Sequence, residues 1–340
     1  MNKFIQKQLK WSTPVELPTA EWHISHTDPM LMIGSCFAQN IGSYLQEYKF
    51  LCDVNPYGIL YNPLSIAHTL EELGEEKEYT LAELRERNGI WHSWAHHGDF
   101  SSTDPEKTLQ QIRERMMFAS KRLKEAHWLI ITFGTARVYR RKETGEIVGN
   151  CHKYPHKEFE QELLSVECIV QTYIALIEKL RRKNPHLKVL FTVSPIRHTK
   201  DGMHGNQISK ATLLLAVEAL CKQVAEVYYF PAYELVLDEL RDYRFYAEDL
   251  VHPSSQAVEY VWNQFCACCF TEETLSILTS IEEINKALSH KPFYPSSATY
   301  QHFLSQIWDK IQALKQKMPY LDFQNEEQIC QTLLKPSFNP

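Results

Sequence analysis

Short apolar runs alternate with amphipathic segments along most of the chain. Continuous apolar runs occupy residues 30–33, 128–133 and 188–193, and a shorter run follows at 227–230. Their length is typical of buried parallel strands, and segments with helical periodicity lie between them. This order of strand, helix, strand and helix predicts an α/β fold with a doubly wound parallel sheet and helices on both of its faces.

The same periodicity predicts where the other elements lie. Helices are expected at 64–70, 81–87, 107–124, 163–180 and 209–225, and another begins near residue 254. Residues 51–63 hold two Asn-Pro pairs around a glycine and predict a long ordered loop. Residues 90–100 alternate aromatic and polar side chains, which suggests short strands outside the main sheet.

Three regions follow from this pattern. Residues 1–29 form an irregular lead-in with prolines and tryptophans, and residues 30–270 carry the α/β pattern. Residues 271–340 contain only helical patterns, at 272–289, 297–317 and 326–334, separated by prolines. We expect this part to be a helical C-terminal extension, which either covers the active site or forms a dimer interface of a homo-oligomer.

Polar or glycine-containing loops follow the predicted strands. They lie at 34–35, 55–58, 134–137 and 194–198. Ligands of open parallel sheets bind outside the carboxyl ends of the strands, so these loops should meet at one crevice.

Ser35 lies between the first strand and the helix that follows it. A serine in this position can be a nucleophile, because the helix N-terminus supplies N–H groups that stabilise an anion. Serine is also a frequent helix N-cap, and this segment alone leaves both roles open.

Asp249 and His252 are three residues apart in a polar loop before a helix. At this spacing the carboxylate can accept a hydrogen bond from one ring nitrogen of the histidine and leave the other free as a general base. The alternative is that both residues cap the following helix.

Composition excludes several classes of protein. The 340 residues carry a formal net charge of -6, with scattered basic residues, so we expect no nucleic-acid partner. The N-terminus lacks the apolar core of a secretory signal and no run is long enough to span a membrane, which predicts a cytoplasmic protein without membrane contact. Nine cysteines without framework spacing fit reduced thiols.

No metal or cofactor is expected. Cys266 and Cys269 lack a second ligand pair at zinc-site spacing. His92, His96 and His97 lack a suitably spaced acidic or thiol partner, which favours aromatic packing or a substrate-rim loop.

These residues together resemble a known group of enzymes. Gly34-Ser35, Gly134 and Asp249-x-x-His252 follow the block order of the SGNH-hydrolase superfamily, and Gly34-Ser35-Cys36-Phe37-Ala38 resembles the signature of the GSCFA-domain family, a branch of that superfamily. Further segments that are similar to the family are 194–198, 206–210 and 241–246.

The resemblance implies a three-layer α/β/α fold, with Ser35 as nucleophile, His252 as general base and Asp249 as its orienting partner. It implies an oxyanion hole built from the Ser35 amide, the Gly58 amide and an asparagine side chain.

Ala136 stands where that asparagine is expected. Loss of one such donor costs about a hundred- to a thousandfold in rate. The residues considered for oxyanion or substrate binding in this crevice are Gly58, Gly134, Asn55, Thr135, Arg137, His198 and Asn206. Arg137 could hold an anionic substrate group, or form a structural ion pair with Asp242 or Glu248.

The expected function is a serine hydrolase that removes an acyl group from a carbohydrate-like or other polar ester. Trp91, Trp94, Tyr57 and His198 are expected to line an aromatic crevice suited to a sugar. An acyltransferase with the same triad is one alternative. A ligand-binding member of the fold without catalysis is another, supported by Ala136.

Overall fold

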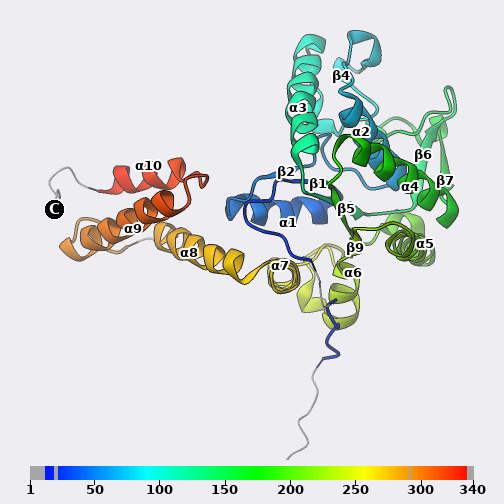
Figure 1. Cartoon of the computed structure of the whole chain (residues 1–340). Coiled ribbons are helices and arrows are strands. Elements are labelled where there is room, and N and C mark those ends of the chain that lie inside the picture. Colours follow the sequence, from blue (N-terminus) through cyan, green and yellow to red (C-terminus); the bar gives the residue numbers. More distant parts are fainter. Residues whose placement is uncertain (1–11, 19–21, 291, 335–340) are drawn as a thin grey trace, which may run out of the picture.

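The computed structural model describes residues 12–18, 22–290 and 292–334 (Figure 1). Within the predicted lead-in 1–29, residues 1–11 and 19–21 lie outside the described residues. Its described part includes Trp22, which is buried against Trp128 and Tyr228.

The core is a five-stranded parallel sheet in the order β2-β1-β5-β8-β9. Its strands are β1 (Met30–Gly34), β2 (Cys52–Val54), β5 (Trp128–Phe133), β8 (Lys188–Val193) and β9 (Val227–Tyr229). The chain passes from β1 to β2 on one side and then crosses to β5 on the other. The strand order therefore reverses between β1 and β5, where ligand sites form in open sheets.

Helices cover both faces of the sheet. On β1, Leu31 and Ile33 pack into one core cluster and Met30 and Met32 into the other, as the period-two alternation of a strand requires. The first cluster is covered by α2 (Pro63–Glu75), α3 (Pro105–Glu125), α4 (Val166–Lys183) and α5 (Gly202–Gln223). The second is covered by α1 (Cys36–Glu47), α6 (Ala232–Glu234) with η5 (Leu235–Glu239), and α7 (Ser255–Cys269). The three-layer α/β/α prediction is therefore confirmed.

Two antiparallel hairpins project from this framework. They are formed by β3 (Arg85–Arg87) with β4 (Ile90–His92) and by β6 (Arg137–Arg141) with β7 (Phe159–Leu163). Short 3-10 turns are η1 (Leu81–Glu83), η2 (Gly98–Phe100), η3 (His156–Glu158), η4 (Thr199–Asp201) and η6 (Tyr243–Phe245). The helix predicted at 81–87 is wrong, because this segment is one 3-10 turn followed by β3.

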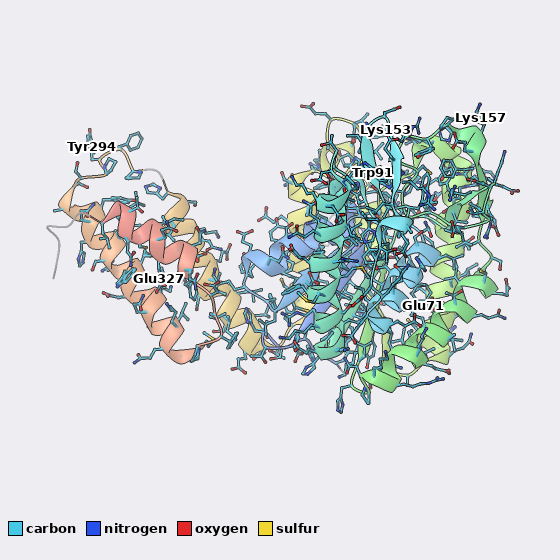
Figure 2. All side chains as sticks on the ribbon, turned by 90° about the horizontal axis from the view of Figure 1, so that it is seen from above. Glu71, Trp91, Lys153, Lys157, Tyr294 and Glu327 are labelled. Atoms are coloured by element: carbon cyan, nitrogen blue, oxygen red, sulfur yellow. The ribbon has the colours of Figure 1, made fainter. Side chains whose placement is uncertain are left out.

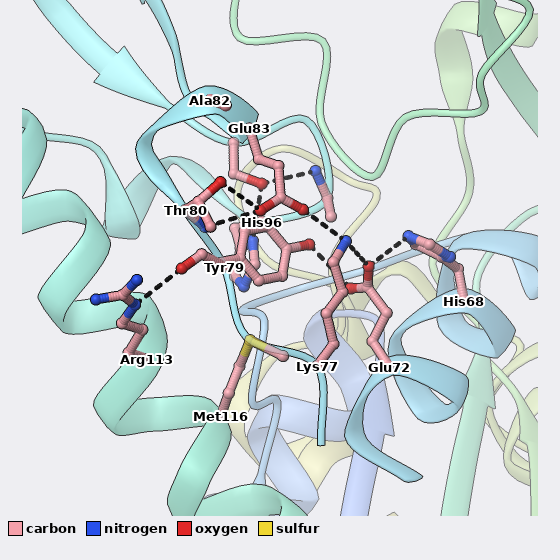
Figure 3. Close-up of polar contacts among 12 residues, drawn as sticks. His68, Glu72, Lys77, Tyr79, Thr80, Ala82, Glu83, His96, Arg113 and Met116 are labelled. Carbon is pink, nitrogen blue, oxygen red and sulfur yellow. Dashed lines mark hydrogen bonds and ion pairs between the residues drawn. The ribbon is translucent and has the colours of Figure 1, made fainter. Parts of the chain in front are cut away.

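A buried carboxylate attaches the segment 77–104 to α2 (Figure 3). Glu72 accepts hydrogen bonds from Tyr57 Oη (2.8 Å), Tyr79 Oη (2.9 Å) and Lys77 Nζ (2.5 Å). Burial alone would raise the pKa of Glu72, but hydrogen bonds from His68, Lys77 and Tyr57 lower it to about 2. Glu72 is therefore an ionised anchor beneath this segment.

The C-terminal region forms its own small core. Its helices are α8 (Glu272–Ser289), α9 (Ala298–Lys317) and α10 (Gln324–Leu333), and they extend to one side of the sheet (Figure 1). Figure 2 shows Tyr294 and Glu327 on this extension, far from Trp91.

The extension docks through Lys49, which pairs with Glu326 (2.8 Å) and lies over the Phe323 ring. Lys49 lies between the end of α1 and the start of β2, at the amino edge of the sheet. The docking contact therefore lies at the edge opposite the carboxyl-end loops, and α10 does not cover the crevice there.

Candidate active site

Gly34 and Ser35 form the turn between β1 and α1. Gly34 has φ of 147°, and a Cβ at this position would lie 2.2 Å from the Thr132 carbonyl oxygen, so only glycine fits. Ser35 is the N-cap of α1, and its Oγ accepts a hydrogen bond from the Phe37 amide (3.3 Å). The side chain is buried, at 2% exposure. The N-cap role is thus present in this conformation.

Asp249 and His252 are in direct contact. His252 Nδ1 lies 2.6 Å from Asp249 Oδ2, and Asp249 Oδ1 accepts from the amides of His252 and Val251. Hydrogen bonds from the His252 amide and side chain are the main reason that the pKa of Asp249 falls to about 2. About half of each side chain is exposed. The alternative that this pair caps α7 is wrong, because Ser254 is the N-cap and accepts from the Ala257 amide.

Backbone pairing fixes the loop that carries this pair. Ala247 N donates to His252 O (2.7 Å), and Ser254 N donates to Phe245 O (2.8 Å). The segment 245–254 therefore folds back on itself as a hairpin-like loop, with Asp249 near its tip.

A series of contacts runs from the Ser35 turn to the loop 194–198. Tyr61 Oη lies 3.5 Å from Cys36 Sγ, and the Tyr61 ring contacts the His198 ring edge-on, with centroids 5.3 Å apart. Burial, aided by the charge of Lys210, lowers the pKa of His198 to about 4, although the charge of Asp201 opposes this shift. His198 is therefore neutral at pH 7.

Ser35 and His252 are not joined by a hydrogen bond within the described chain. The Ser35 amide donates to Thr132 O (3.3 Å), and Ser35 Oγ has the Phe37 amide as its partner. For catalysis, Ser35 Oγ would have to give up its hydrogen bond with the Phe37 amide and turn towards His252.

The other expected oxyanion donors are engaged as well. The Gly58 amide donates to Asn55 O (2.8 Å) in a turn where Gly58 has φ of 77° and packs against His97. The Asn55 side chain accepts from Gly34 N (2.9 Å) and donates to Gln39 Oε1 (3.0 Å). An oxyanion would have to compete with the Asn55 carbonyl for the Gly58 N–H. Asn55 itself supports the nucleophile turn.

A polar side chain of α5, Ser209, contacts the loop that contains Ala136. Ser209 Oγ accepts from the Ala136 amide (2.7 Å) and lies 3.0 Å from Thr135 Oγ1, while the Gly134 and Thr135 amides donate to Tyr61 O. Ala136 is fully buried. Thr135 and Ser209 therefore fix the loop where the asparagine was expected.

One face of α5 carries the other polar groups of the crevice. Asn206 Oδ1 accepts from the His198 amide (2.9 Å), whereas Asn206 Nδ2 is buried and has no hydrogen-bond partner among the residues that the structure describes. One turn further, Lys210 Nζ donates to Gly134 O and Ser194 O, both at 2.6 Å. Burial, aided by the charge of Arg197, lowers the pKa of Lys210 to about 7. Sequence reasoning did not assign Lys210 a role, although it lies in the family-like segment 206–210.

Arg137 has a different ion-pair partner from those predicted. Its Nε lies 3.7 Å from Asp201 Oδ2, at the start of α5. The structural ion pair is present, but Asp242 and Glu248 do not provide it.

The aromatic residues mostly pack elsewhere. Tyr57 is fully buried, so the prediction that it lines the crevice is wrong. His96 stacks on Tyr57, with ring centroids 3.9 Å apart, and burial lowers the pKa of His96 to about 3. Trp94 packs with His92 and Tyr154. His92 and His96 thus lie in aromatic packing, one of the two roles predicted for this segment, whereas His97 Nδ1 lies 3.0 Å from Asp99 Oδ2.

Metal-ligating side chains do not gather anywhere in the part of the chain that the structure describes, which has no group of three or more suited to an ion. All nine cysteines are free thiols. Among the described helices, none is both long and apolar enough to cross a membrane.

Comparison with known proteins places the chain in a family. The model of the GSCFA family matches residues 29–265, and a model described as the C-terminal domain of GSCFA domain proteins matches 281–336. A search of curated proteins gave no match. Since the first model spans more than half of the chain and includes the Ser35 turn and the Asp249–His252 pair, the protein belongs to the GSCFA family.

Proposed function

We propose that this protein is a serine hydrolase related to the SGNH superfamily, which cleaves an acyl ester on a carbohydrate-like or other polar substrate. The observation that carries the proposal is the Asp249–His252 pair, with Nδ1 and Oδ2 2.6 Å apart. A carboxylate on Nδ1 fixes the tautomer in which Nε2 can accept a proton.

The proposed reaction begins when Ser35 Oγ leaves the Phe37 amide and turns to the crevice. His252 Nε2 takes the hydroxyl proton as Oγ bonds to the acyl carbon, and the ester C–O bond breaks as His252 returns the proton to the leaving alcohol. Water, deprotonated by His252, then attacks the acyl-enzyme and releases the acid and free Ser35.

The oxyanion needs donors that are free. In the described structure the amides of Cys36 and Ala38, in the first turn of α1, donate to no other group, as is usual at a helix N-terminus. Asn206 Nδ2 is a buried donor that has no partner in the described part of the chain. We propose that these groups substitute for the missing asparagine at position 136.

A binding protein without catalysis is the second candidate. It is favoured by the buried, capping Ser35 and by the engaged amides of Ser35 and Gly58. In that case the Asp249–His252 pair would only recognise a ligand.

An ester panel tests the proposal. We expect Ser35→Ala and His252→Ala to lower kcat/KM by about a thousandfold or more for every ester that the wild type hydrolyses, because both act in one unit. Ser43→Ala, an exposed serine on α1, is the control. Equal rates in the variants and the wild type contradict the triad, and transfer of the acyl group to an added alcohol would assign the chain as an acyltransferase.

A further inference from the structure

The segment Arg241-Asp242-Tyr243-Arg244-Phe245-Tyr246 has no role in the proposed reaction, yet it borders a cavity of about 700 Å³. The wall is formed by residues 239–245, with Tyr260 and Ser12 completing it. Tyr243 is 73% exposed, which is unusual for a large ring beside a cavity.

The acidic groups of this cavity are already engaged. Glu239 accepts from the Tyr260 hydroxyl and from the Val15 amide (2.9 Å). Asp242 accepts from the Arg244 amide (2.9 Å) and lies 3.5 Å from Arg244 Nε. Arg241 Nε donates to the Asp238 carbonyl, and the terminal nitrogens of Arg241 have no partner among the described residues.

The lining is therefore charge-balanced, with two guanidinium and two carboxylate groups around an exposed phenol ring. Such a set does not favour a net charge on its ligand. Planar hydrogen-bonding groups beside an aromatic face suit a molecule with many hydroxyl groups and apolar C–H faces.

The cavity adjoins the candidate catalytic loop. The rings of Tyr243 and Tyr246 are 6.1 Å apart, and Tyr246 pairs with Pro253, next to His252. Tyr243, on the wall of the cavity, is therefore connected through Tyr246 to the loop that carries His252.

We infer that this cavity binds the carbohydrate portion of the ester substrate, with Tyr243 as the stacking surface and Arg241 as a donor to sugar hydroxyls. The inference rests on the proposed function, because it places the acyl group of the same molecule at Ser35.

Binding and kinetics separate the two proposals. Calorimetry with Ser35→Ala measures the affinity for partially O-acetylated xylotetraose, which is neutral, and for O-acetylated tetragalacturonate, which is acidic. We expect Tyr243→Ala and Arg241→Ala, added to Ser35→Ala, to weaken binding of the neutral oligosaccharide about tenfold or more. Tyr294→Ala is the matched control, because Tyr294 is 78% exposed on the distant C-terminal extension (Figure 2).

In the active protein, Tyr243→Ala should raise KM for acetylated xylotetraose more than it lowers kcat. It should also lower the ratio of kcat/KM for this substrate to kcat/KM for p-nitrophenyl acetate about tenfold. If no activity depends on Ser35 but binding still depends on Tyr243, the proposed reaction fails and the carbohydrate site stands. The inference is overturned if neither oligosaccharide binds, if only the acidic one binds, or if Tyr243→Ala behaves like Tyr294→Ala.

Discussion

Ser35 combines two roles that can be measured separately. Its Oγ caps α1 in the structure, and the proposed reaction needs the same atom as nucleophile. Stability reports the first role and ester hydrolysis the second.

Ser35→Ala should therefore reduce stability as well as activity. Loss of an N-cap costs about 1 kcal/mol in the free energy of unfolding, which denaturant titration measures. Ser165→Ala removes the equivalent cap of α4, where Ser165 Oγ accepts from the Cys168 amide. We expect a similar loss of stability in both variants and a loss of hydrolysis only in Ser35→Ala. Unchanged stability in Ser35→Ala alone would show that the cap is not formed in solution.

Because of Lys210, the free energy of unfolding should increase as the pH rises above 7. Its folded-state pKa of about 7 lies below that of the unfolded chain, so between these values the unfolded state binds more protons and stability rises with pH. The difference in unfolding free energy between wild type and Lys210→Met should thus increase from pH 7 to pH 10. Lys222→Met, on the exposed side of α5, should show no such trend. A flat difference for Lys210→Met contradicts the shifted pKa.

At this scale the sequence predicted the contact between Asp249 and His252, because a spacing of three within one loop leaves few alternatives. It did not predict that Ser209 would fix the Ala136 loop. That contact joins residues 73 apart in the chain, and no local pattern encodes it.

Among the elements, long periodic segments were predicted well and short ones were not. The strands β1, β5, β8 and β9 and the long helices follow from burial on one or two faces, which leaves a clear period in the sequence. The short strand β2 was not predicted, because it lies in the segment 51–63 that was expected to be a loop. Leu81 and Leu84 have helical spacing, and Thr80 and Glu83 form a capping box at the start of η1, but the backbone becomes extended at Leu84 and the turn ends there. Asn88-Gly89, both with positive φ, then form the two-residue turn between β3 and β4. This Asn-Gly pair was the local signal for a hairpin.

The attachment of the segment 77–104 to α2 should depend on Glu72. Glu72→Gln removes a buried charge that has several donors, which costs on the order of 3 kcal/mol in unfolding free energy at pH 7. Because the folded pKa of Glu72 is about 2, this contribution is present above pH 4.5 and is lost as the pH falls towards 2. Hydrogen exchange should show faster amide exchange in 77–104 in the variant. Glu75→Gln, at an exposed pair with Lys179, is the control, and equal protection in both variants would contradict the anchor role.

For the whole molecule, the position of the C-terminal extension was beyond the sequence. The amphipathic pattern of a helix shows that its apolar face is buried, but it does not show which other element buries that face. Lys49 contacts Glu326 and Phe323 at the amino edge of the sheet. This contact lies on the opposite edge from the loops of the crevice.

Phe323→Ala should loosen the extension without affecting the site. Phe323 is 1% exposed in the core of the extension, and truncation of such a ring costs about 3–5 kcal/mol. We expect hydrogen exchange to rise in α9 and α10 while the amides of β1, β5 and β8 stay protected and ester hydrolysis is unchanged. Equal loss of protection in both regions would show that they unfold as one unit.

The central claim is that Ser35 is a nucleophile activated by His252, and covalent labelling tests it most directly. A fluorophosphonate probe, followed by peptide mass spectrometry, should modify Ser35 in the folded wild-type protein. His252→Ala should react much more slowly, and Ser35→Ala should not be labelled. An unlabelled Ser35 in protein whose circular dichroism shows the native fold would contradict the claim and assign the fold to ligand binding.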